Sequence, residues 1–118
     1  MRLFVDVDDT LVLWQGLDGE SSMDSWTPNE ALIKAIIEYV YTTPDVYLYI
    51  WSGGGVGYAE LFAERLLGDV VPYAALSKDT TMPQDDDVCI DDQFLKVKGR
   101  CVTWERWCSE EQSTGDNS

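Results

Sequence analysis

The chain has no histidine, and its three cysteines do not form a closely spaced pair. Structural zinc sites are built from clustered cysteine and histidine ligands, so a zinc site is not expected. An odd number of cysteines without paired spacing is typical of a reducing compartment. Because the N-terminus also lacks the pattern of a signal peptide, the sequence predicts a cytoplasmic location.

Positively charged residues are also scarce. Eight lysines and arginines stand against 22 aspartates and glutamates, which gives a net charge of −14. Affinity for nucleic acids depends largely on lysine and arginine contacts with phosphates, so a nucleic-acid partner is not expected. No apolar run reaches the length needed to cross a bilayer, and no membrane partner is expected either.

The composition is nevertheless that of a folded protein, because 45% of the residues are hydrophobic. Residues 1–108 are expected to form one domain, and the polar residues 109–118 a disordered tail. Apolar runs with strand character alternate with helical patterns, which predicts an α/β fold with a parallel sheet. Thr27 is expected to cap the first helix. Strands are expected at 2–8, 46–51, 70–76, 87–91 and 100–103, and helices at 28–41, 58–67 and 104–108.

The most informative segment is Asp-Val-Asp-Asp-Thr at residues 6–10, directly after an apolar run. A buried strand that ends in carboxylates is costly unless a cation neutralises them, and oxygen ligands favour Mg²⁺. Asp6 and Asp8 lie two residues apart, so in extended backbone they point to the same side. Such a pair can serve as a nucleophile and an acid/base.

Three later features fit the same site. Ser52 and a glycine-rich turn follow the second predicted strand, and Asp91 and Asp92 follow the fourth. Lys78 lies between them in the sequence. Since ligands of parallel sheets bind at the carboxyl ends of strands, these residues are expected to meet Asp6 there. The glycines would let backbone N–H groups approach a phosphate.

In this order, the acidic strand end, the hydroxyl strand end, the lysine and the acidic pair resemble the four motifs of the haloacid dehalogenase-like (HAD) superfamily of hydrolases. The resemblance covers roughly residues 2–95. It implies a three-layer, Rossmann-like parallel sheet with helices on both faces. The intervals from Asp8 to Ser52 and from Ser52 to Lys78 are too short for an additional cap domain, which indicates a small uncapped phosphatase.

The resemblance also implies a chemical role for each residue. The chain would be a Mg²⁺-dependent phosphatase that hydrolyses a phosphomonoester through an aspartyl phosphate. Asp6 would be the nucleophile, Asp8 the acid/base, and Lys78 the residue that balances charge. The residues expected to bind the phosphate or shape its site are Thr10, Ser52, Gly53 and Gly54. Mg²⁺ would be held by the Asp6 carboxylate, the backbone carbonyl of Asp8 and Asp91, with Asp92 bound directly or through water.

Several alternatives stay open at this point. The expected substrate is a phosphorylated sugar or another small metabolite, and a homo-oligomer could close the uncapped site. A phosphotransferase would use the same aspartyl phosphate. The alternative functions are a non-catalytic acidic binding protein on the same fold and a PIN-type metal-dependent nuclease. Ser52 could be an ordinary turn residue and Lys78 an exposed lysine. Residues 85–87, all aspartate, are expected to be a solvated run.

Overall fold

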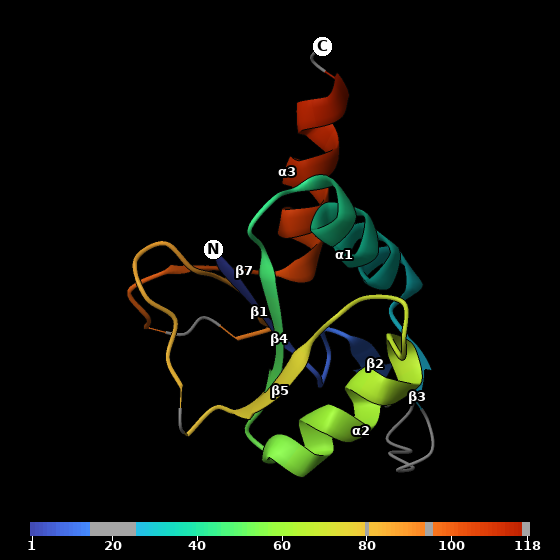
Figure 1. Cartoon of the computed structure of the whole chain (residues 1–118), viewed down its shortest axis with the longest axis vertical. Helices are drawn as coiled ribbons and strands as arrows, with labels where there is room; N and C mark the ends of the chain where they lie inside the picture. The colour runs from blue at the N-terminus through green and yellow to red at the C-terminus, as the bar shows by residue number, and fades with distance from the viewer. Residues whose placement is uncertain (15–25, 80, 94–95, 117–118) are drawn as a thin grey trace.

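A five-stranded sheet forms the centre of the protein in the computed structural model, which describes residues 1–14, 26–79, 81–93 and 96–116 (Figure 1). The strand order is β5-β4-β1-β6-β7, and all neighbours are parallel. The expected α/β fold with a parallel sheet is therefore confirmed. The strands are β1 (Arg2–Asp6), β4 (Tyr47–Ser52), β5 (Ala74–Ser77), β6 (Val88–Ile90) and β7 (Arg100–Val102).

The strand order places a topological switch point at the middle of this sheet. From β1 the chain runs outward through β4 to β5 on one side and then returns to β6 and β7 on the other. In open α/β sheets, ligands bind at the carboxyl ends of the strands where the order reverses. Asp6 is the last residue of β1, and Asp91 directly follows β6. Both predicted carboxylates therefore lie at the switch point.

The segment after β1 forms a second, smaller sheet. Strands β2 (Val12–Trp14) and β3 (Trp26–Pro28) pair antiparallel, and residues 15–25 between them lie outside the described part of the chain. Thr27 pairs with Leu13 in this sheet. The prediction that Thr27 caps the first helix is therefore wrong, because strand pairing continues through that residue. The cap is Asn29, whose side-chain oxygen accepts from the backbone N–H of Leu32 at 3.3 Å.

The described residues form three helices, α1 (Glu30–Thr42), α2 (Val56–Leu66) and α3 (Trp104–Asp116). Helix α2 starts two residues earlier than expected and is followed by Gly68 in the left-handed conformation, with φ of 49°, as the sequence predicts for its end. Helix α3 is longer than the single turn expected and includes residues 109–116 of the polar C-terminal segment. Among the described residues, no helix combines the length and apolar character needed to cross a membrane.

The two faces of the sheet are covered differently. Buried side chains of α1, α2 and α3 all join one hydrophobic cluster with Leu3, Val5 and Ile50. The opposite face carries a separate cluster around Phe4, Trp51 and Cys89, to which no described helix residue belongs. In Figure 1, α1 and α2 lie to the right of β4, and residues 81–87 lie to the left. Helices on both faces, and hence a three-layer arrangement, are not confirmed.

The run of aspartates before β6 is only partly solvated. Asp85 and Asp86 are exposed, whereas Asp87 is 5% exposed. The Asp87 carboxylate accepts hydrogen bonds from Arg2 Nε at 3.0 Å, Arg2 Nη2 at 2.6 Å and the backbone N–H groups of Arg2 and Gln84. The prediction of a solvated run is therefore wrong for Asp87. Its hydrogen bonds connect the start of β1 to the loop before β6. Burial alone would raise the pKa of Asp87, but the hydrogen bonds outweigh it and lower that pKa.

Replacing Asp87 with asparagine should destabilise the fold by about 2 kcal/mol at pH 7, because Arg2 loses its charged partner. The lowered pKa means that this stabilisation is complete above the ordinary aspartate pKa of about 4 and is lost as the pH falls through the lowered value. Urea unfolding of Asp87→Asn and wild type at several pH values measures the difference. Asp86→Asn, an exposed neighbour, should change stability by less than about 0.5 kcal/mol. Equal losses in the two variants would contradict this role.

Candidate active site

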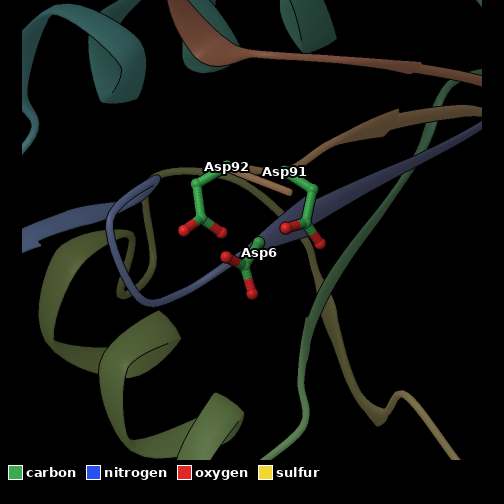
Figure 2. A group of neighbouring side chains, drawn as sticks. All are labelled: Asp6, Asp91 and Asp92. Carbon is green, nitrogen blue, oxygen red and sulfur yellow. The ribbon is translucent and has the colours of Figure 1, made fainter. Parts of the chain in front are cut away.

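Three carboxylates from distant parts of the sequence meet at the switch point. Asp6, Asp91 and Asp92 each offer an oxygen atom, and these atoms all lie within 4.8 Å of one another. Figure 2 shows the three side chains converging from the end of β1 and from the segment after β6. Parallel pairing of Val5 with Ile90 aligns the two strand ends. Asp6 is 4% exposed and Asp91 1%, whereas Asp92 is exposed.

Lys78 bridges two of these carboxylates. Its Nζ lies 3.0 Å from Asp6 Oδ1 and 2.6 Å from Asp91 Oδ2. The backbone N–H of Lys78 donates to the Ser52 carbonyl at 3.1 Å, which extends the pairing of β5 with β4 and brings the lysine to the same edge as Asp6. Lys78 is therefore not an unrelated exposed lysine. Burial would lower the pKa of Lys78, but its hydrogen bonds and charge contacts with Asp91 and Asp6 raise it, so the amine stays protonated.

The site has more negative than positive charge. Burial raises the pKa of Asp6 to about 7, the negative charge of Asp91 adds to this rise, and Lys78 opposes it. Burial also raises the pKa of Asp92. A single lysine among three carboxylates leaves an excess that either a proton or a cation can balance. The donor set consists of carboxylate oxygens, which fits a hard divalent cation such as Mg²⁺ or Ca²⁺.

Thr10 orients the buried Asp6 carboxylate. The Thr10 side chain is fully buried, and its hydroxyl donates to Asp6 Oδ2 at 3.3 Å. Lys78 contacts the other oxygen, Oδ1, so the two residues hold the carboxylate from both sides. This geometry favours an orienting role for Thr10 over the expected contact with phosphate, because the hydroxyl proton is already engaged.

Asn29 anchors the turn that follows β1. Its Nδ2 donates to the Thr10 carbonyl at 2.8 Å, and its backbone N–H donates to the Leu11 carbonyl at 2.9 Å. The start of α1 is thus tied directly to the loop that carries the acidic motif. Asn29 was not among the predicted site residues, although asparagine before a helical pattern is a strong N-cap signal. Asp9 is exposed in the same turn and adopts the left-handed conformation with φ of 57°.

Asp8 does not join the three clustered carboxylates. Its Oδ1 accepts a hydrogen bond of 2.7 Å from the hydroxyl of Tyr58, in the first turn of α2. The structure thus brings together the three side chains expected to hold the metal, those of Asp6, Asp91 and Asp92, whereas the expected contribution of Asp8 is its backbone carbonyl. No local sequence pattern marks Tyr58, since 50 residues separate it from Asp8.

Ser52 is the last residue of β4, next to the end of β1, and the glycines follow it in the chain. Ser52 is 1% exposed, and its Oγ accepts from the Gly54 N–H at 3.0 Å, which leaves the hydroxyl proton as a donor. Gly55 has φ of 106° and caps α2, a conformation that favours glycine. A Cβ on Gly54 would lie 3.2 Å from the Tyr58 ring, a tight contact, whereas Gly53 has open space around it.

Comparison with protein-family models, curated proteins and solved structures finds no match to this chain. A groove of about 660 Å³ lies between α1 and α2, but its lining includes none of the predicted site residues. The convergence of buried charges makes the strand ends the stronger candidate for a reaction site. Function therefore has to be inferred from the chemistry of the residues at this edge of the sheet.

Removing the Asp6 charge should change how stability depends on pH in metal-free protein. The folded state keeps a proton on Asp6 up to about pH 7, whereas the unfolded chain releases it near pH 4. As the pH rises between these values, wild type should lose stability relative to Asp6→Asn. Urea unfolding of both proteins in a chelator measures this trend, with Asp86→Asn as the exposed control. Parallel curves for wild type and Asp6→Asn would show that Asp6 titrates normally.

Proposed function

We propose that the chain is a Mg²⁺-dependent phosphatase of the HAD-like, uncapped type, which hydrolyses a phosphomonoester through an aspartyl phosphate on Asp6. The bridging of Asp6 and Asp91 by Lys78, at 3.0 and 2.6 Å, is the observation that carries this proposal. The strand order supports it, since open α/β sheets bind ligands at the switch point of the strand order. The expected substrate is a phosphorylated sugar or another small metabolite.

The surroundings of Asp6 suit an attacking carboxylate. Thr10 and Lys78 hold its two oxygens, so little reorientation is needed before reaction. An anionic nucleophile that approaches an anionic phosphate needs positive charge between them, and Lys78 provides one such charge. When bound, Mg²⁺ held by Asp6, Asp91 and Asp92 would supply further positive charge for the phosphoryl oxygens. The hydroxyl of Ser52 can donate to one of those oxygens.

The reaction proceeds in two displacements at phosphorus. In the first, an Asp6 oxygen forms a bond to phosphorus while the bond to the leaving oxygen breaks, and Asp8 gives a proton to that oxygen. In the second, Asp8 takes a proton from water, the water oxygen attacks phosphorus, and the bond to Asp6 breaks. The products are an alcohol and inorganic phosphate. Transfer to an acceptor alcohol in place of water would make the same site a phosphotransferase.

The metal component is tested by the effect of Mg²⁺ on stability. A cation that binds only the folded state adds about 2.7 kcal/mol at a hundredfold excess over its dissociation constant. Asp91→Asn removes one ligand, so the Mg²⁺-induced rise in melting temperature should shrink to a small fraction of the wild-type value. Thermal melting across a Mg²⁺ titration at fixed ionic strength measures it, with Asp86→Asn as control. A full wild-type shift in Asp91→Asn would exclude Asp91 as a ligand.

The role of Asp6 as the nucleophile is tested by measuring the activity of Asp6→Asn and wild type on a panel of phosphorylated metabolites with Mg²⁺. Because asparagine keeps the size but cannot form the intermediate, kcat/KM should fall by about a thousandfold or more. Asp9→Asn is the matched control, since the change is identical and asparagine tolerates the left-handed conformation of that position. Activity in the control should stay within a few-fold of wild type. Wild-type rates in Asp6→Asn would refute the proposed intermediate.

A further inference from the structure

Tyr58 connects two loops that the proposed function places around the same phosphate. It lies in the first turn of α2, after the glycine loop, and its hydroxyl donates to Asp8 Oδ1 at 2.7 Å. That distance is typical of a hydrogen bond donated by a hydroxyl to an oxygen atom. A tyrosine hydroxyl has an ordinary pKa of about 10, so it carries its proton at neutral pH. The Tyr58 hydroxyl is therefore available as a hydrogen-bond donor at physiological pH.

The ring of Tyr58 is held independently of Asp8. It packs edge-on against Phe62, one helical turn further along α2, with ring centroids 5.0 Å apart. The ring also lies next to Gly54, where an added Cβ would be 3.2 Å from the nearest ring atom. Phe62 itself is buried in the core cluster and packs edge-on against Trp26. The position of the hydroxyl is thus set by α2 and the core.

We propose that Tyr58 is a positioning residue for Asp8, which fixes the rotation of the Asp8 carboxylate for proton transfer to the leaving oxygen. The proposal rests on the proposed function, because it takes Asp8 as the acid/base. The terminal torsion of an aspartate is broad and roughly two-fold, so a lone carboxylate samples many orientations. A hydrogen bond from a rigid ring narrows that range, and small errors in orientation are costly in proton transfer.

The leaving group distinguishes positioning of an acid from a general structural role. A nitrophenolate leaves readily without a proton, whereas an alkoxide needs one from Asp8. Loss of the Tyr58 hydroxyl should therefore slow alkyl phosphates much more than p-nitrophenyl phosphate. A merely structural defect would slow both substrates by the same factor, because it would reduce the fraction of competent enzyme.

The test compares wild type, Tyr58→Phe and Tyr73→Phe on glycerol phosphate and p-nitrophenyl phosphate at saturating Mg²⁺. Phenylalanine keeps the ring packing and removes only the hydroxyl. The measured quantity is kcat/KM, because it covers the steps through formation of the phosphoenzyme and not the hydrolysis that both substrates share. We expect kcat/KM of Tyr58→Phe on glycerol phosphate to fall about 10- to 100-fold, with a change of less than about threefold on p-nitrophenyl phosphate. Tyr73→Phe, in the loop before β5, should match wild type on both substrates.

A second measurement places Tyr58→Phe in the Asp8→Asn background. If Tyr58 acts through Asp8, the double variant should be no slower on glycerol phosphate than Asp8→Asn alone. Additive losses, or equal losses on the two substrates, would overturn the inference and leave the proposed function intact. Absence of turnover by wild type on both substrates, with the metabolite panel also negative, would overturn the proposed function and the inference with it.

Discussion

The pair of carboxylates buried at the end of β1 and after β6 is the constraint on which the rest of the site depends. Asp6 and Asp91 are almost fully removed from water, and burying a carboxylate without compensation is costly. Lys78 supplies part of that compensation from the far side of β4. The strand order allows this geometry, because the parallel strands β5, β4, β1 and β6 end at the same edge of the sheet. A lysine after β5 and an aspartate after β6 can therefore meet at the end of β1.

Hydrogen bonds from residues far away in the sequence hold the loops around this charge cluster. Asn29 joins the cap of α1 to the turn after β1, and Tyr58 joins α2 to Asp8. At the opposite end of β1, Arg2 donates hydrogen bonds to Asp87 in the loop before β6. Each contact links a polar group to a rigid strand or helix. Such support matters for a reactive site, because an error of about 1 Å in the position of a catalytic group can remove most of its effect.

Much of the fold could be predicted because local patterns encode it. Alternating strand and helix patterns predicted the parallel sheet, and polar residues directly after apolar runs predicted that Asp6, Ser52 and Asp91 lie at strand ends. What the sequence could not show depends on long-range packing. Thr27 has the chemistry of a cap, but its pairing with Leu13 moved the cap to Asn29. Asp87 looked like part of a solvated run because its partner, Arg2, is 85 residues away. No local sequence pattern marks Tyr58, because its contact with Asp8 depends on where α2 packs in the fold.

Protons and cations compete for the same oxygens at this site. In the metal-free protein the raised pKa of Asp6 keeps a proton in the cluster up to about pH 7, which limits repulsion but would block the attack proposed for this carboxylate. A divalent cation bound by the same carboxylates would favour their ionised form, so its binding would release a proton and free Asp6 for that attack. Activation of the proposed nucleophile and stabilisation of the fold would then come from one event. The cost of burying these charges would thus be the physical basis for coupling metal binding to the proposed reaction.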